Sequence, residues 1–274
     1  MGRLNYFHNN PKASKIDVHA YLQRIETKQE SPSLDFLRKL HRAHLLHIPF
    51  ENLDIHYQRK IILDYEMIFR KVIVNKRGGY CYELNGLFYH LLYHLGFEAK
   101  VISARVRDEA SGAYGKDFDH MAVVVHLAGE DYLVDVGFGR GIMYPKKIVT
   151  DHVQMDYTDY WRIAKDVDDH YLLQSSDNAS VFATKYLFTT DAKELIQFLE
   201  MNEFQQFHPT SHFQKQKLIT KLTDSGRITL TDRAFKVLHL GKVQTTEIGN
   251  EDEFLALLEQ HFKIPLAQLI RQDP

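Results

Sequence analysis

Apolar residues in the first hundred positions recur every three or four residues, which is typical of amphipathic helices. The spacing predicts a helix at residues 14–27 with Ser14 as its N-cap, and a second at residues 34–46 with Ser33 as its N-cap. A shorter helix is expected at residues 64–74. This part of the chain therefore predicts a compact helical bundle.

A fourth helix is expected to begin near Cys81. Gly78 and Gly79 free the backbone to turn sharply just before an apolar run at helical spacing. By contrast, residues 47–53 are expected to be irregular, because Pro49 disfavours helix at the residue before it.

The periodicity changes in the middle of the chain, where short apolar runs are bounded by glycine or charged residues, as in strands. Strands are expected at residues 99–106, 121–127, 132–136, 161–164, 171–174 and 185–188. These runs predict an antiparallel sheet or barrel.

The last third of the chain mixes both patterns. A helix capped by Asp191 is expected at residues 191–203, and a last helix at residues 252–262. Short strands are expected between them, at residues 217–222, 228–230 and 234–240. This segment therefore predicts an α/β arrangement.

Composition narrows the function classes. The 274 residues are 44% hydrophobic and 26% charged, as in an ordinary globular chain, with a formal net charge of -2. Lysine and arginine are scattered, so we expect no nucleic-acid partner and no polybasic membrane patch. A single cysteine cannot form an internal disulfide, and the first thirty residues are polar, so a cytoplasmic location is expected. No apolar run approaches the roughly 20 residues of a membrane helix.

The single cysteine, Cys81, is a candidate nucleophile. In the first turn of a helix, unpaired backbone amides and the helix dipole favour a thiolate over a thiol. A lone cysteine is also compatible with a small buried apolar residue. The rest of the candidate chemistry therefore decides between the two interpretations.

Two polar residues stand at the ends of the predicted middle strands. His120 precedes the run at residues 121–125, and Asp135 interrupts the run at residues 133–139. If those runs pair, an imidazole base and an orienting carboxylate meet, which is what a thiol nucleophile requires. Alternatively, His120 is one of 16 histidines with no special role, and Asp135 bonds to a turn at Gly137.

Four pieces of sequence together resemble the arylamine N-acetyltransferases. They are residues 49–53 (Pro-Phe-Glu-Asn-Leu), residues 77–85 (Arg-Gly-Gly-Tyr-Cys-Tyr-Glu-Leu-Asn), His120, and residues 134–139 (Val-Asp-Val-Gly-Phe-Gly). The resemblance covers most of the chain and is strongest from His47 to Arg140. The motif around the cysteine is the most specific piece.

The resemblance implies an α+β fold of three regions with a cysteine-protease-like catalytic core. Residues 1–97 would form a helical bundle that carries the cysteine, and residues 98–190 an antiparallel β-barrel that carries the histidine and aspartate. Residues 191–274 would form an interdomain helix and an α/β lid.

The resemblance also implies a role for each catalytic residue. Cys81 would take an acetyl group from acetyl-coenzyme A (acetyl-CoA), His120 would act as base and acid, and Asp135 would orient the imidazole. An aromatic amine, hydrazine or hydroxylamine would then attack the acetyl-cysteine in a ping-pong reaction. No metal is expected.

Other matched positions would shape the site. Phe50, Phe138 and Phe213 would line the acceptor pocket, the last of them within a family-like stretch at residues 208–213. Gly137 and Gly139 would let coenzyme A approach the backbone. Ordinary core packing of Phe50 and Phe138 is the alternative.

A structural ion pair is also implied by the resemblance. Glu51 and Arg77 would brace the cysteine loop rather than take part in chemistry.

Three other functions remain compatible with these residues. A hydrolase or transglutaminase-like enzyme would use the same triad, and a related amide synthase would differ in its pocket. A binding module would hold acyl-CoA without turnover, but the three intact triad positions disfavour it. No glycine-rich phosphate loop occurs in the sequence, so coenzyme A is expected in a cleft between barrel and lid.

Overall fold

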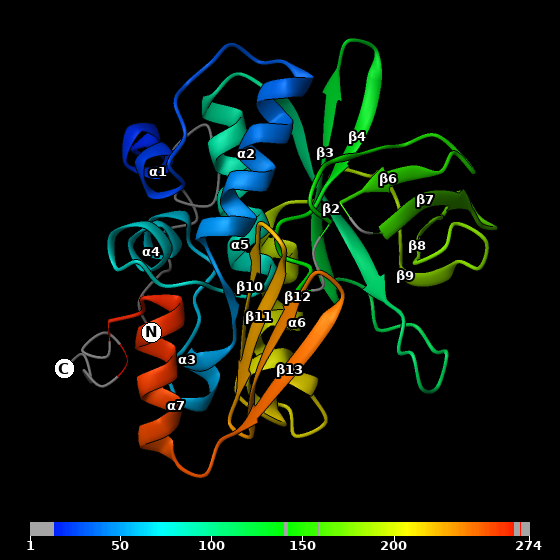
Figure 1. Ribbon diagram of the computed structural model, residues 1–274. Helices are drawn as coiled ribbons and strands as arrows, with labels where there is room; N and C mark the ends of the chain where they lie inside the picture. Colours follow the sequence, from blue (N-terminus) through cyan, green and yellow to red (C-terminus); the bar gives the residue numbers. More distant parts are fainter. Residues whose placement is uncertain (1–13, 140–141, 158, 266–268, 270–274) are drawn as a thin grey trace.

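The computed structural model describes residues 14–139, 142–157, 159–265 and 269. A group of helices lies on one side, a curved sheet on the other, and a second sheet beneath them (Figure 1). The α+β class and its order of helices, barrel and C-terminal sheet with helix are therefore as predicted. Arg140, at the end of the motif-rich stretch, and residues 1–13 and 270–274 of the predicted terminal regions lie outside the described residues.

The N-terminal helices follow the apolar pattern closely. They are α1 (Val18–Arg24), α2 (Leu34–His47), α3 (Leu53–His56), α4 (Tyr65–Phe69) with its π-helical continuation η2 (Arg70–Val74), and α5 (Cys81–His94). Ser33 caps α2 as predicted, because its side chain accepts from the Phe36 amide. The predicted cap of α1 is wrong: Asp17, not Ser14, accepts from the Ala20 amide.

The middle of the chain forms an antiparallel barrel that is nearly closed. Its strands are β2 (Glu98–Val106), β3 (His120–Leu127), β4 (Glu130–Val134), β5 (Lys146–Lys147), β6 (Gln154–Asp156), β7 (Asp159–Lys165), β8 (Tyr171–Ser176) and β9 (Ala183–Phe188). They follow the order β5-β4-β3-β2-β9-β8-β7-β6. A bridge between Thr150 and Ile163 brings the two ends of this sheet together.

The segment that leaves the barrel is helical but begins later than predicted. It consists of η3 (Leu195–Phe198) and α6 (Leu199–Phe207), followed by the 3-10 turn η4 (His212–Gln214). Glu194 rather than Asp191 occupies the N-cap.

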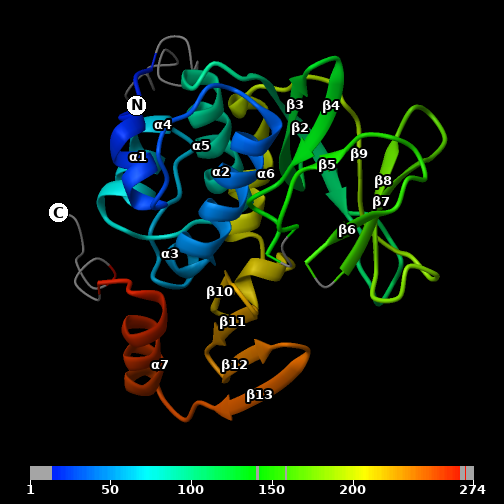
Figure 2. The same cartoon turned by 45° about the horizontal axis from the view of Figure 1, so that its top comes forward.

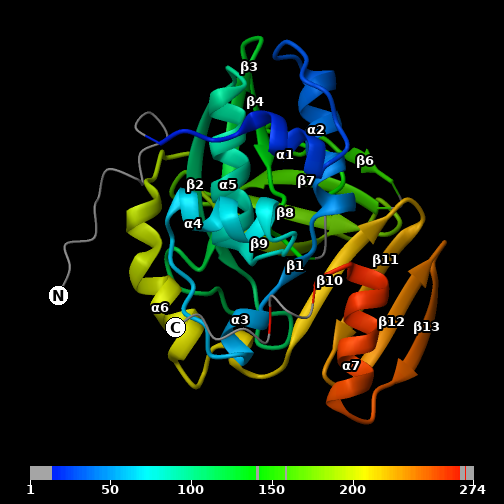
Figure 3. The same cartoon turned by 90° about the vertical axis from the view of Figure 1, so that its left-hand side faces the viewer.

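A second sheet follows, in the order β1-β10-β11-β12-β13. Its strands are β1 (Phe50–Glu51), β10 (Leu218–Thr223), β11 (Gly226–Thr231), β12 (Ala234–His239) and β13 (Lys242–Glu247). The prediction missed β13, whose residues are all exposed, and β1, which belongs to the segment expected to be irregular. Helix α7 (Glu251–Leu257), with its continuation η5 (Leu258–Phe262), covers one face of this sheet (Figure 3).

One large core joins the helices to the barrel. It contains buried side chains of α2 and α5 together with Val101, Met121 and Val123 from the barrel strands. Helix α5 therefore packs directly on β2 and β3, and Figure 2 shows α2, α4 and α5 grouped on one side of the molecule with the barrel strands on the other. We propose residues 1–97, 98–190 and 191–274 as the three structural regions. No helix in the described part of the chain is long and apolar enough to cross a membrane.

Candidate active site

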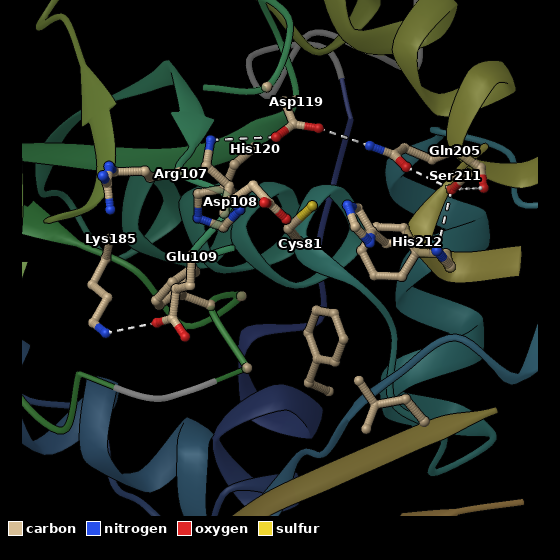
Figure 4. Close-up of a pocket in the computed structure, with 18 of the residues that line it drawn as sticks. Cys81, Arg107, Asp108, Glu109, Asp119, His120, Lys185, Gln205, Ser211 and His212 are labelled. Atoms are coloured by element: carbon tan, nitrogen blue, oxygen red, sulfur yellow. Dashed lines mark hydrogen bonds and ion pairs between the residues drawn. The ribbon is translucent and has the colours of Figure 1, made fainter. Parts of the chain in front are cut away.

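A cavity of about 1080 Å³ lies where the start of α5, the barrel and the second sheet meet. Cys81 and His120 both line it (Figure 4). Its other walls come from the loop between β2 and β3, from residues 201–213, and from β10 to β12. Three regions that are distant in sequence therefore enclose the candidate nucleophile.

Cys81 is the first residue of α5 and is only 3% exposed. The two preceding glycines are needed for close packing. A Cβ at Gly78 would lie 2.1 Å from the Pro49 carbonyl oxygen, and one at Gly79 would lie 2.8 Å from Glu83 Oε2. The Glu51 amide donates to the Gly79 carbonyl at 2.8 Å, which ties this loop to β1.

His120 and Asp135 meet at the ends of two paired strands. His120 begins β3, Asp135 follows β4, and the register of these strands brings the two residues together. The His120 Nε2 atom lies 2.8 Å from Asp135 Oδ2, and both side chains are buried. Because Nε2 faces the carboxylate, Nδ1 is the ring nitrogen left for Cys81.

Electrostatics favour an imidazolium at this position. Burial lowers the pKa of His120, but the charge and hydrogen bond of Asp135, together with Cys81, raise it to about 10. Burial raises the pKa of Asp135, but the charge and hydrogen bond of His120 hold that pKa below its usual value. A charged His120–Asp135 pair at neutral pH is the consequence, and it can stabilise a neighbouring thiolate.

Several groups that sequence reasoning missed hold Asp135 in place. The Asn85 side-chain amide donates to Asp135 Oδ1 at 2.8 Å, and the Tyr186 hydroxyl donates to Oδ2 at 3.0 Å. The Asp135 amide donates to His41 Nε2 at 3.2 Å. Asn85 could have been found, since it lies one helical turn after Cys81. His41 and Tyr186 carry no comparable signal because they come from remote elements.

The two glycines after Asp135 differ in what surrounds them. A Cβ at Gly137 would lie 2.6 Å from Asn85 Nδ2, 2.8 Å from Cys81 Cα and 3.0 Å from the Cys81 carbonyl oxygen. A Cβ at Gly139 would meet Thr220 and Phe50 at the ordinary distances of 3.5 and 3.6 Å. Packing against the cysteine backbone thus accounts for Gly137 without any ligand, and both residues line the cavity.

The three phenylalanines named from the sequence line the same cavity. Phe50 lies 6.2 Å from Phe213 between ring centroids, and Phe138 lies 5.6 Å from His120 in an edge-on arrangement. The cavity's apolar side is therefore aromatic and adjoins the imidazole.

Charged residues line the side of the cavity formed by the barrel. They come mainly from the loop between β2 and β3, to which sequence reasoning assigned no role. They are Arg107, Asp108, Glu109, Lys116 and Asp119, joined by Lys185 from β9; Figure 4 labels all of them except Lys116. Lys185 donates to Glu109 at 3.1 Å, and Gln205 donates to Asp119 at 2.9 Å. This loop is thereby connected to β9 and α6.

Glu51 and Arg77 form a buried ion pair beneath the cysteine loop. Arg77 Nη2 lies 2.7 Å from Glu51 Oε1 and also 2.7 Å from Asp54 Oδ1. Lys71 lies 2.7 Å from Asp54 and 2.9 Å from Glu83, so the pair is part of a larger network. Three carboxylates and two cations therefore support the turn before α5.

Among the described residues, no group of three or more histidine, cysteine, aspartate or glutamate side chains is placed to hold a metal ion.

The site combines a buried thiol at a helix start with an imidazole and a carboxylate beside one aromatic cavity. This arrangement defines a cysteine-dependent enzyme of the acyl-transfer class. A family model described as N-acetyltransferase matches residues 33–270. The chain is 31% identical to the arylamine N-acetyltransferase of Mycolicibacterium smegmatis over 94% of its length and 95% of that protein. It belongs to the arylamine N-acetyltransferase family and is an acyltransferase.

Solved structures agree in fold. The M. smegmatis enzyme superposes with a TM-score of 0.87 at 30% identity, covering 94% of this chain and 96% of that one. The Mycobacterium marinum arylamine N-acetyltransferase in complex with CoA gives 0.85 at 29% identity, covering 93% and 95%. The chain is also 30% identical to proansamycin X synthase of Amycolatopsis mediterranei, over 89% of its length and 96% of that protein.

Proposed function

We propose that this enzyme transfers the acetyl group of acetyl-CoA to the nitrogen of arylamines, arylhydrazines and arylhydroxylamines through an acetyl-Cys81 intermediate. The observation that carries the proposal is the placement of Cys81 and His120 in one cavity, with Asp135 2.8 Å behind the imidazole. His120 would be the acid and base, and Asp135 its orienting group.

In the first half-reaction, the Cys81 thiolate forms a bond to the carbonyl carbon of acetyl-CoA. The bond from that carbon to the coenzyme A sulfur breaks, and the leaving thiolate takes the proton held on His120 Nδ1. In the second, the acceptor nitrogen attacks the acetyl-cysteine and His120 accepts its proton. The carbon–sulfur bond to Cys81 then breaks, which restores the thiolate and the imidazolium.

The aromatic wall supports a flat acceptor. Phe50, Phe138 and Phe213 line the cavity beside His120, so an aryl ring packed among them would hold its amine near the acetyl-cysteine. Aromatic pairs with centroids about 4.5–7 Å apart stabilise such packing.

The charged side of the cavity supports binding of coenzyme A. Lys116 and Arg107 line it and could meet the phosphates, while the backbone at Gly137 and Gly139 would flank the pantetheine. The M. marinum relative was solved in complex with CoA, and its chain superposes over most of this one.

A related amide synthase is the second candidate. Proansamycin X synthase is as similar in sequence as the acetyltransferase relatives, and a cavity of about 1080 Å³ is at the upper end of ligand pockets. Such an enzyme would acylate the same cysteine with a larger acyl group.

The test is the intact mass of the protein after mixing with acetyl-CoA alone, followed by peptide mapping, with Cys81→Ser as the control. One acetyl group on Cys81, released on adding aniline, is the expected result. A cysteine that reacts with iodoacetamide but never takes an acetyl group would overturn the acetyltransferase proposal in favour of another acyl donor.

A further inference from the structure

Two histidines at the far end of α5 lie outside the catalytic cavity. His90 and His94 are one turn apart in its last part, and their Nε2 atoms lie 3.1 Å from each other. Ser14, which precedes α1, approaches both rings. Its carbonyl oxygen lies 3.3 Å from His90 Nε2 and 3.1 Å from His94 Nε2, and its Oγ lies 3.1 Å from His90 Nε2.

These spacings match the edges of a metal coordination shell. Zinc binds imidazole nitrogen at about 2.0–2.1 Å, so neighbouring ligands are roughly 3.0 Å apart at right angles and roughly 3.4 Å apart in a tetrahedron. The four measured distances from 3.1 to 3.3 Å fall within this interval. Two nitrogens and two oxygens thus form one cluster in which each atom lies 3.1–3.3 Å from at least one other.

Two neutral imidazoles whose Nε2 atoms face each other cannot both point a proton into the gap, so at least one of these nitrogens presents a lone pair there. His90 is 1% exposed, and its Nδ1 atom is buried without a hydrogen-bond partner in the described structure. A proton on that Nδ1 would leave the Nε2 lone pair directed at His94 and Ser14, which is the tautomer that a metal ligand uses.

The surroundings hold one ring in place and leave the other accessible. The Tyr65 ring packs on the His90 ring with centroids 4.4 Å apart and fixes its plane. His94 is exposed, so an ion can enter from solvent.

We propose that His90, His94 and Ser14 bind one divalent cation of the zinc, nickel and copper group, with water completing the shell. Imidazole ligands favour these metals. The site has only two imidazoles, so an exchangeable ion is expected rather than one that the fold requires. The bound ion would fasten residue 14 to the helix that carries Cys81, about 13 Å along α5 from that residue.

The test is equilibrium dialysis against Zn²⁺ at pH 7.5 on the full chain. Cys81→Ser serves as the background, because a thiolate binds zinc by itself. One zinc per chain is expected, and adding His94→Gln should weaken binding at least ~10-fold. Adding His152→Gln, a change at an exposed histidine, should leave binding unchanged.

Two results would overturn the site. One is zinc binding that His94→Gln and His152→Gln weaken equally. The other is no binding by the Cys81→Ser protein at about 100 μM Zn²⁺, a concentration at which a site with two imidazole ligands should be occupied. The visible absorption of bound Co²⁺ gives a second readout. The bands from nitrogen and oxygen ligation should disappear with His94→Gln and persist with His152→Gln. This proposal stands whether or not arylamines are the acceptors.

Discussion

Replacing Gly137 by alanine should separate the catalytic residues without removing any of them. The new Cβ would lie 2.6 Å from Asn85 Nδ2 and 2.8 Å from Cys81 Cα, whereas ordinary contacts begin at 3.4 Å. The strand end or the start of α5 must therefore move, by 0.6–0.8 Å if ordinary contacts are to be restored. Asn85 also donates to Asp135, so the shift would disturb the acid as well as the nucleophile.

The magnitude follows from overpacking and from alignment. Extra methyl groups in a packed core cost about 1–3 kcal/mol, or about 2–4 °C of melting temperature per kcal/mol in a chain of this size. A misplacement of about 1 Å at a reacting centre can lower the rate roughly 100-fold. We therefore expect Gly137→Ala to fold with reduced stability and to lose at least ~10-fold in kcat/KM.

Gly139→Ala is the matched control, because its Cβ would make ordinary contacts at 3.5–3.6 Å. The assay compares both variants by thermal unfolding, and compares Gly137→Ala with wild type by the rate of acetyl transfer to an arylamine. Wild-type stability and activity in Gly137→Ala, or equal losses of stability in both variants, would refute the reasoning.

Three further predictions concern charge. Arg77→Ala should lower the free energy of unfolding in urea by about 3–5 kcal/mol because the buried Glu51 carboxylate loses its close ion-pair partner. Arg38→Ala at an exposed pair should change it by less than about 1 kcal/mol, and equal effects would contradict this. Burial raises the pKa of Glu83 to about 7 from 4.5, so this side chain stabilises the fold below pH 4.5 and loses that contribution as the pH rises through 7. The stability of wild type relative to Glu83→Gln should therefore fall over that interval, by up to about 3 kcal/mol, and a constant difference would disprove the shift. Finally, iodoacetamide should modify Cys81 at pH 6 faster than it modifies a free thiol, and Asp135→Asn should slow this alkylation at least ~10-fold. Alkylation no faster than that of a free thiol would show that no thiolate–imidazolium pair exists.

Local physics made much of the fold predictable. Helices α2 and α5 have a cap or a glycine turn followed by continuous helical spacing, so their starts agree with the sequence pattern. The predicted helix start was wrong where a residue with the right local pattern makes tertiary contacts instead of capping the helix. Ser14 does not cap α1, because it lies against His90 and His94 instead.

Elements that depend on distant pairing were not predictable. Strand β1 has two residues and exists because Phe50 and Glu51 pair with Thr220 and Ile219 of β10. Strand β13 is exposed along its whole length, so it carries no apolar alternation to mark it.

For the site, the sequence by itself determined the chemical groups: one thiol after two glycines, and an imidazole and a carboxylate at the ends of apolar runs. Tertiary structure decided which groups hold them. Tyr186 and His41 reach Asp135 from β9 and α2, because packing α5 onto the barrel brings separate elements around one buried carboxylate. Spacing along a chain records only neighbours within an element, so contacts between elements appear only once the core is assembled.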